Sequence, residues 1–249
     1  MHLMNLSWQE TESYLQQRKS IILPLGSFEQ HGPNGMIGTD IICPERIAKS
    51  VTEETGILIG PSISVGMAQH HLAFAGSVTL RPTTLIAVIQ DYVTSLARHG
   101  FIQFLFLNGH GGNSASVEAA FSQIHAEVSL GRSPQDQPEL DLVLCDWYTG
   151  KRVAALSDEL FPGIEGSHAT PSEISLTYFA YPEHKKNVGP MEPRVAPHGG
   201  FGSASDFRKN YPDGRIGSDP SSASAEFGAR MCEASSADVI ERLQGLGFV

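Results

Sequence analysis

The chain has 249 residues, of which 41% are hydrophobic and 18% are charged, and its formal net charge is −10. This length suits one large α/β domain, and so low a charged fraction excludes a disordered chain. The acidic balance argues against a nucleic-acid partner, which would need a basic face, and no run of 18 apolar residues could span a membrane. We therefore expect a single domain over residues 1–249 that binds neither nucleic acid nor membrane.

The three cysteines, Cys43, Cys145 and Cys232, are widely spaced and form no Cys-x-x-Cys pair. An odd, scattered set is typical of a reducing compartment, where buried thiols act as small apolar side chains. The first residues lack the basic and apolar regions of a secretory signal. Together these features predict a cytoplasmic protein.

Apolar and amphipathic segments alternate along the chain, which predicts βαβ units and a mostly parallel sheet. Residues 20–25 are apolar and predict a first strand. A helix is expected to begin near Pro44, since proline suits a first helical turn, and to end at Gly56. Residues 57–59 then predict a short strand. Thr83 is a candidate N-cap for the next helix.

The second half continues the same alternation. Residues 101–107 form a continuous apolar run, as expected for a strand covered on both faces. Ser114 is expected to cap the helix that follows, residues 131–140 to form a surface loop, and residues 141–145 to form a further strand. Residues 185–220 are rich in Pro, Gly and Ser, which indicates either a mobile excursion or a lid or subunit contact.

The first strand leads into a loop that carries two acids and a histidine. Glu29, His31 and Asp40 lie within twelve residues, and loops after buried strands are where α/β enzymes place their chemistry. On a looped backbone Glu29 and His31 can reach a common centre, and carboxylate with imidazole suits Zn²⁺, Mn²⁺ or Fe²⁺. The alternative is a polar turn with a hydrogen-bonded histidine.

Two further loops carry histidines. The long apolar strand ends in Asn108-Gly109-His110-Gly111-Gly112-Asn113, whose glycines let the backbone approach a ligand closely. Such a turn can instead bind phosphate, although the Rossmann and Walker patterns are absent. In the third loop His168 precedes a helix predicted to begin at Pro171, with Glu173 in its first turn, where a glutamate can simply favour the helix dipole. Three such loops at strand ends predict one shared site.

These loops resemble the creatininase (creatinine amidohydrolase) family over about residues 18 to 190. The matching motifs are Gly26-Ser27-Phe28-Glu29-Gln30-His31-Gly32-Pro33, Gly38-Thr39-Asp40, the loop over residues 108–113, and His168 with Glu173 five residues later. The resemblance implies a three-layer α/β/α fold with a mostly parallel, mixed-edge sheet. It also implies an amidohydrolase with two divalent metal ions per chain (Zn, Mn or Fe), a small-molecule amide substrate, and a homo-oligomer, often a hexamer.

Carried over by position, the resemblance implies that Glu29 and His110 bind one metal ion and His31 the other. Asp40 matches the carboxylate that bridges both ions, and His168 matches the family's catalytic histidine.

One ligand of the second ion departs from the family pattern. In creatininase proper a glutamate two residues after the matching histidine supplies it, whereas this chain has Gly112 there. Members with the Gly-Gly loop take the ligand from the downstream glutamate, so Glu173 is expected to bind the second ion. The alternative is that Glu173 only caps its helix or holds His168.

The substrate pocket is less completely matched. Trp147 matches a tryptophan that walls the pocket in creatininase proper, the alternative being a core aromatic residue at a strand end. A second pocket tryptophan falls at Ile164, so creatinine itself is a doubtful substrate. Of His70 and His71, at most one is expected to face the site, because adjacent residues of an extended chain point to opposite faces. His70 is the candidate pocket residue.

The reaction that the resemblance implies is attack of a metal-bridging hydroxide on a C–N bond of a cyclic amide or formamide. His168 would protonate the leaving nitrogen or hold the oxyanion. A Gly-x-Ser-x-Gly nucleophile motif is absent. Two alternatives are a metal-dependent peptidase of peptide maturation and a non-catalytic metal-binding scaffold, against which the retained His168 argues.

Overall fold

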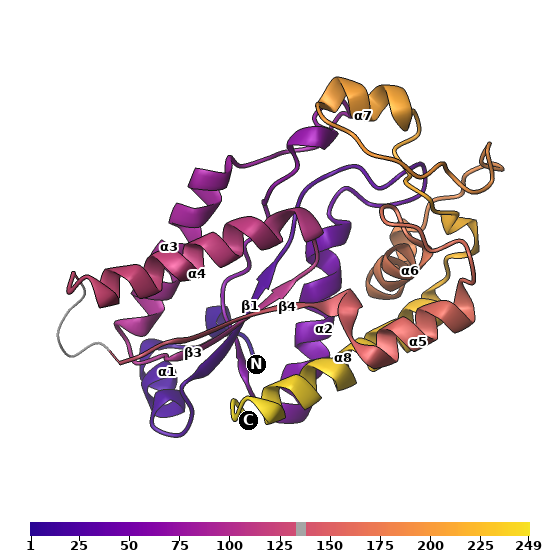
Figure 1. Cartoon of the computed structure of the whole chain (residues 1–249). Coiled ribbons are helices and arrows are strands. Elements are labelled where there is room, and N and C mark those ends of the chain that lie inside the picture. Colours follow the sequence, from indigo (N-terminus) through magenta and orange to yellow (C-terminus); the bar gives the residue numbers. More distant parts are fainter. Residues whose placement is uncertain (133–137) are drawn as a thin grey trace.

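A sheet of four strands in the order β2-β1-β3-β4 lies at the centre of the computed structural model, which describes residues 1–132 and 138–249 (Figure 1). The strands are β1 (Ser20–Leu25), β2 (Leu58–Ile59), β3 (Gln103–Asn108) and β4 (Asp141–Asp146). Every pair of neighbouring strands is parallel. The parallel sheet is confirmed, whereas the described residues contain no antiparallel edge strand. Antiparallel pairing is limited there to isolated bridges between loops, such as Phe28 with Val78.

The side chains of the strands alternate between two hydrophobic cores, as the pleat of a sheet requires. Ile21 and Leu23 pack with residues of α3 (Pro82–Ala97) and α4 (Ser114–Ser129). Ile22 and Leu105 pack with residues of α2 (Thr39–Thr55) and α8 (Ala225–Gly245) on the opposite face. Figure 1 shows these two helix layers on either side of the strands. The three-layer α/β/α prediction is therefore confirmed.

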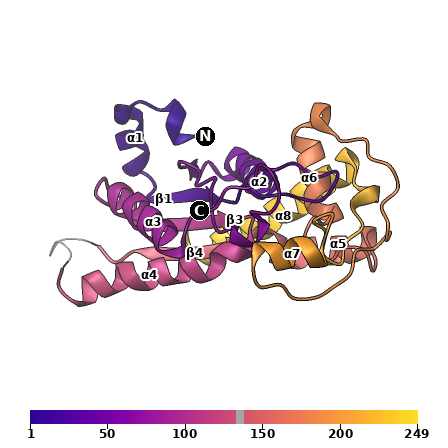
Figure 2. The ribbon, with the colours of Figure 1, turned by 90° about the horizontal axis from the view of Figure 1, so that it is seen from above.

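The remaining helices lie at the two ends of the molecule. They are α1 (Trp8–Leu15), α5 (Lys151–Leu160), α6 (Pro171–Ala180) and α7 (Ala204–Asn210). Figure 2 shows α5, α6 and α7 at the opposite end from α1. Because α1 precedes β1 directly, the end with α5 to α7 is the end at which the parallel strands finish.

Most strand and helix predictions are close to the observed elements. The strands expected at residues 20–25, 57–59, 101–107 and 141–145 are β1, β2, β3 and β4, and α6 begins at Pro171 as expected. Residues 133–137 of the predicted surface loop lie outside the described residues.

Three helix starts were wrong. Ser114 does not cap α4 but is its first residue, because a 3-10 turn over Gly111–Asn113 leads directly into the helix and leaves Asn113 in the cap position. Thr83 is not an N-cap, because α3 begins one residue earlier at Pro82, with Arg81 in the cap position. Helix α2 begins at Thr39, and Pro44 lies inside it. Proline lacks the N–H that would bind the carbonyl four residues earlier, here that of Asp40. The helix therefore continues through Pro44 at the loss of a single hydrogen bond.

The freed carbonyl of Asp40 lies where two loops approach α2 closely. A Cβ atom added at Gly26 would come within 2.5 Å of this oxygen, and one added at Gly109 within 2.0 Å. Glycine at both positions thus lets the loops after β1 and β3 pack directly on the first turn of α2.

None of the helices described in residues 1–132 and 138–249 is long and apolar enough to cross a membrane. Cys43 and Cys232 are buried in the core as expected, while Cys145 is half-buried. All three are free thiols.

Candidate active site

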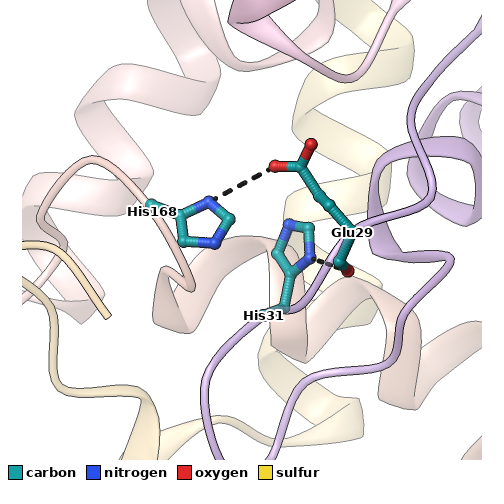
Figure 3. Close-up of side chains that lie close together, drawn as sticks. All are labelled: Glu29, His31 and His168. Atoms are coloured by element: carbon teal, nitrogen blue, oxygen red, sulfur yellow. Dashed lines mark hydrogen bonds and ion pairs between the residues drawn. The ribbon is translucent and has the colours of Figure 1, made fainter. Parts of the chain in front are cut away.

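The three predicted loops meet beyond the carboxyl ends of the parallel strands. Loops after neighbouring parallel strands share one edge of the sheet, and β1 and β3 are neighbours. The third loop joins them from the segment between α5 and α6. All six predicted metal-binding and catalytic residues come together there: Glu29, His31, Asp40, His110, Glu173 and His168. Figure 3 shows three of these side chains, Glu29, His31 and His168, converging.

Asp40 lies at the centre of the cluster and is only 2% exposed. Its Oδ1 lies 3.0 Å from Nε2 of His31, and its Oδ2 lies 3.1 Å from Nδ1 of His110. Two possible ligand groups therefore share this carboxylate: Glu29–Asp40–His110 and His31–Asp40–Glu173, each with its ligand atoms within 4.8 Å of one another. A third group, Glu29–His31–His168, overlaps both.

Backbone carbonyls set the tautomers of the two histidines that face Asp40. Nδ1 of His31 donates to the carbonyl of Glu29 at 3.1 Å, as Figure 3 shows. Nε2 of His110 donates to the carbonyl of Met67 at 2.6 Å. The other nitrogen of each ring faces Asp40; it carries a proton in the metal-free protein, because both pKa values are raised, and it would offer a lone pair to a metal ion once that proton is lost. Both rings are thus oriented as metal-binding histidines are.

The same contacts shift the pKa values of the cluster. Burial opposes protonation of His31, but Asp40 and Glu173 outweigh it and raise the pKa of His31 to about 10. Burial also opposes protonation of His110, but Glu29 and Asp40 outweigh it and raise the pKa of His110 to about 9. Burial opposes the charge on Asp40, yet the two histidines hold its pKa below the usual value. Burial raises the pKa of Glu29, and that of Glu173 to about 7.

Two carboxylate oxygens of the cluster have no hydrogen bond among the described residues. They are Oε1 of Glu29 and Oδ2 of Asp40, both buried. An unsatisfied buried acceptor is costly unless a donor or a cation faces it. Imidazole nitrogens and carboxylate oxygens together suit Zn²⁺, Mn²⁺ and Fe²⁺. The residues present therefore fit divalent metal ions.

The two carboxylate oxygens of Glu173 have different neighbours. Oε1 accepts a hydrogen bond from the backbone N–H of Thr170 at 2.5 Å, and the Thr170 hydroxyl accepts from the N–H of Glu173 in return. This reciprocal pair is a capping box at the start of α6. Oε2 lies 3.8 Å from Nε2 of His31. Glu173 thus caps its helix and still directs one oxygen toward the cluster.

At Gly112 there is no room for a ligand side chain. A Cβ atom added there would lie 2.3 Å from Nε2 of His110, the nitrogen that binds the Met67 carbonyl. Any side chain at this position would displace His110 from its present orientation. This geometry agrees with a carboxylate supplied by Glu173.

Two asparagines hold the loop around His110. The side chain of Asn108 donates to the His110 carbonyl at 2.7 Å and accepts from the His110 N–H at 3.2 Å. Asn113 donates to the carbonyl of Gly26 at 3.0 Å, which ties this loop to the one after β1. Since the His110 N–H is already bound, the loop is shaped to present an imidazole rather than amides for a phosphate.

His168 is buried and faces Glu29. Its Nε2 lies 2.8 Å from the carbonyl oxygen of Gln30, to which it donates, and its Nδ1 lies 3.7 Å from Oε1 of Glu29 (Figure 3). The hydroxyl of Ser218 donates to the His168 carbonyl at 2.7 Å. Burial, followed by the positive field of His31 and His71, holds the pKa of His168 well below its usual value. The imidazole is therefore neutral at pH 7.

A cavity of about 460 Å³ opens beside the cluster. Its wall includes Asp40, His110 and Glu173 on one side and Trp147 and Tyr148 on another. Trp147 is 2% exposed, lines this cavity and also packs into the core, so both interpretations of the residue hold. Ile164, at the position of the second tryptophan, packs against the core.

Of the two adjacent histidines, His71 contacts Glu29, while the ring of His70 lies 6.4 Å from that of His110, and neither lines the cavity. Nε2 of His71 lies 3.1 Å from Oε1 of Glu29. His70 is half-buried, stacks on Phe201 with ring centroids 4.5 Å apart, and is not among the residues that line the cavity. A short 3-10 turn over Gln69–His71 decides which ring points inward. The sequence predicted that only one would, but gave no signal for which.

Gln30 was also missed, although it lies inside the predicted motif. It is 6% exposed, and its amide lies within 3.0 Å of nitrogens of both His71 and His168. Its position between Glu29 and His31, two predicted metal ligands, was the signal in the sequence that could have identified it.

Comparison with known proteins agrees with this site. The sequence model of the creatininase family, described as creatinine amidohydrolase, matches residues 4–243. The chain is 27% identical over 188 residues to creatinine amidohydrolase of Pseudomonas putida, a match that covers 72% of this chain and 71% of that protein. It is 34% identical over 118 residues to mycofactocin precursor peptide peptidase of Mycobacterium tuberculosis, covering 43% of this chain and 47% of that protein.

Solved structures show the same fold. The structure described as "Creatininase Mn" superposes with a TM-score of 0.84 at 24% sequence identity and covers 98% of this chain and 97% of that one. The family predicted from the three loops is thus confirmed over nearly the whole sequence, and the chain belongs to the creatininase family of metal-dependent hydrolases.

Proposed function

We propose that the chain is a dinuclear metal-dependent amidohydrolase that cleaves a C–N bond of a small cyclic amide or a formamide. One observation carries the proposal: the two oxygens of the buried Asp40 carboxylate face two different histidines, each through the ring nitrogen that does not bond a backbone carbonyl. Glu29 completes the group around His110, and Glu173 the group around His31. One ion of Zn, Mn or Fe in each group would satisfy the unpaired oxygens of Glu29 and Asp40.

Two divalent ions, when bound, would supply Lewis acidity for the amide carbonyl and lower the pKa of water in the site. The protein's own part in proton transfer falls to His168. This imidazole is neutral and holds its proton at Nε2 on the Gln30 carbonyl, which leaves Nδ1 free to take up a proton and pass it to the leaving nitrogen.

The cavity supports a small substrate. Its volume of about 460 Å³ lies in the range of small-molecule sites, and its lining residues all lie between Asp40 and Glu173 in the sequence. Trp147 offers an apolar wall there. Creatinine, the substrate named for the Pseudomonas relative, is a weaker candidate because Ile164 replaces the second aromatic wall.

Peptide cleavage is the second candidate function. The match to the mycofactocin precursor peptidase has the higher identity, 34%, although it covers 43% of this chain. A cavity open along residues 185–220 would favour a peptide substrate, and none of these residues is among those that line it. Parallel assays with lactams, formamides and short peptides would separate the two activities.

The wider setting is proposed from the family resemblance and the composition. We infer one catalytic domain over residues 1–249, a homo-oligomer such as a hexamer, and a cytoplasmic location. Residues 185–220 would serve as a lid or a subunit contact. Light scattering coupled to size-exclusion chromatography measures the number of subunits directly.

The metal content per chain tests the site. Elemental analysis of protein purified without chelator and loaded with Mn²⁺ should give two ions per chain for the wild type. We expect about one ion for Glu173→Gln, and none for Asp40→Asn, because Asp40 belongs to both ligand groups that would hold the ions.

Glu165→Gln is the matched control, since Glu165 lies in the same loop as His168 but belongs to none of the ligand groups. It should leave two ions in place. A wild type that binds one ion or none would contradict the dinuclear proposal and favour a non-catalytic scaffold.

A further inference from the structure

The side-chain amide of Gln30 is surrounded by four polar partners. Oε1 accepts from the N–H of Gly32 at 2.8 Å. Nε2 lies 2.9 Å from the carbonyl oxygen of Gly214, 3.0 Å from Nδ1 of His71 and 2.9 Å from Nε2 of His168. An amide has two N–H groups, so it can serve only two of these three neighbours.

The orientation of this amide follows from two partners with fixed roles. A backbone N–H only donates, so Oε1 must face Gly32. A backbone carbonyl only accepts, so one N–H must point to Gly214. The amide cannot be turned over without breaking both contacts, and one N–H remains for a histidine.

His168 does not need that N–H. Its Nε2 lies 2.8 Å from the backbone carbonyl oxygen of Gln30, which can only accept, so Nε2 carries the proton. The remaining amide N–H of Gln30 therefore goes to Nδ1 of His71, which must hold a lone pair.

The assignment fixes what His71 presents to Glu29. With a lone pair on Nδ1, the neutral ring carries its proton on Nε2, 3.1 Å from Oε1 of Glu29. A protonated nitrogen cannot bind a metal ion, so His71 turns an N–H, and not a lone pair, toward Glu29, although the contact does not align as a hydrogen bond. The hydroxyl of Ser27 donates to the other oxygen, Oε2, at 2.8 Å. The Glu29 carboxylate thus accepts an O–H at Oε2, and the N–H of His71 lies close to Oε1, the oxygen without a hydrogen-bond partner.

The surroundings are shaped to hold the Gln30 amide. Gly214 has a φ of +88°, and a Cβ atom added there would lie 1.7 Å from Oε1 of Gln30. Phe207 of α7 covers His71 edge-on, with ring centroids 4.6 Å apart. Backbone and side chains from residues 207–214 therefore enclose this amide and the imidazole beside it.

We propose that Gln30 is a positioning residue: its side-chain amide fixes the tautomer of His71, which thereby turns an N–H toward Glu29, and its backbone carbonyl fixes the tautomer of His168, which leaves Nδ1 free. The proposal rests on the proposed function only for the roles of Glu29 and His168.

The tautomers are measured directly by NMR of metal-free protein with ¹⁵N-labelled imidazoles, with signals assigned through His71→Gln and His168→Gln. In the wild type both rings should show a protonated Nε2 and an unprotonated Nδ1. In Gln30→Met, a side chain of similar length with no donor, His71 should become a mixture of tautomers. Gln69→Met changes an exposed glutamine two residues from His71 and should leave both rings as in the wild type.

Zn²⁺ affinity gives a second readout. Outer partners of metal ligands typically change affinity by about 10- to 100-fold. We expect such a loss for Gln30→Met and for His71→Leu, rescue by His71→Gln, whose amide restores an N–H, and no change for Gln69→Met.

An unprotonated Nε2 on His71 in the wild type would overturn the proposal, as would a His71 tautomer unchanged by Gln30→Met. If the protein bound no Zn²⁺ at all, the proposed function would fail, while the NMR result would still decide the tautomers.

Discussion

Four buried histidines surround Glu29, and they fall into two electrostatic classes. His31 and His110 each face two carboxylates, which overcome burial and raise the pKa values to about 10 and about 9. For His71 burial dominates, and the neighbouring His31 and His110 add to it, so its pKa falls to about 3. The pKa of His168 is also lowered, by burial and by the neighbouring His31 and His71. His31 and His110 are therefore protonated in the metal-free protein, as metal ligands can be, whereas His71 and His168 are neutral.

Metal affinity should therefore rise with pH. At pH 7 the metal-free protein holds protons on the lone-pair nitrogens of His31 and His110, since both pKa values lie above 7. Binding an ion in each group displaces one proton, so affinity should rise about tenfold per pH unit at each group until the pH approaches about 9 to 10. Mn²⁺ titrations between pH 6.5 and 8.5 measure this slope, and a flat profile would contradict it.

Replacing His168 by alanine should separate catalysis from metal binding. We expect two Mn²⁺ ions per chain to remain while kcat on an amide substrate falls by about 10²- to 10⁴-fold, the usual share of general acid–base catalysis. His125→Ala, at an exposed position on α4, is the control. Because Glu29, His31 and His168 also form a possible ligand group, loss of one ion in His168→Ala would instead make His168 a ligand.

At the scale of elements, the site depends on how closely two loops approach α2. The Asp40 carbonyl has no helical partner because of Pro44, and it lies against the backbone of Gly26 and Gly109. This contact brings the start of α2, which carries Asp40, between the loop with Glu29 and the loop with His110. The proline inside the helix and the two glycines thus form one packing arrangement.

Gly109→Ala tests this arrangement. The added Cβ would lie 2.0 Å from the Asp40 carbonyl oxygen, a backbone atom that cannot move alone. We expect the free energy of unfolding of the metal-free protein to fall by about 1–3 kcal/mol, as for other overpacked sites. Gly189→Ala, where an added Cβ has no neighbour within 4 Å, should change it little. Urea denaturation measures both, and equal stabilities would refute the packing argument.

The sequence predicted the ligand loops well because parallel strands bring their carboxyl ends to one edge. Apolar runs located β1 and β3, so the positions of Glu29 and His110 followed. The start of α2 was misplaced because a proline is usually a first-turn residue, and only the contacts with Gly26 and Gly109 show why this one lies further in. Whether His70 or His71 points toward Glu29 depends on the conformation of the three-residue turn Gln69–His71. The spacing of apolar residues in the sequence does not predict that conformation.

For the whole molecule, the cluster joins loops from all parts of the chain, so bound metal should stabilise the entire fold. A ligand that binds only the folded state at 100 times its Kd adds about 2.7 kcal/mol. For a chain of this size that corresponds to a rise in Tm of about 5 to 10 °C. Calorimetry with and without Mn²⁺ measures the shift, which EDTA should reverse. In Asp40→Asn the shift should vanish, and a shift that persisted would place the metal elsewhere.

The hydrogen bond from Gln30 to Gly214 spans 184 residues of sequence. At ribosomal rates of about 5–20 residues per second, roughly 10 to 40 s separate the synthesis of its two ends. During that interval the motif around Glu29 has left the ribosome without the backbone that encloses Gln30. The enclosure of Gln30 is consequently completed late, after the polypeptide has been made at least as far as Gly214.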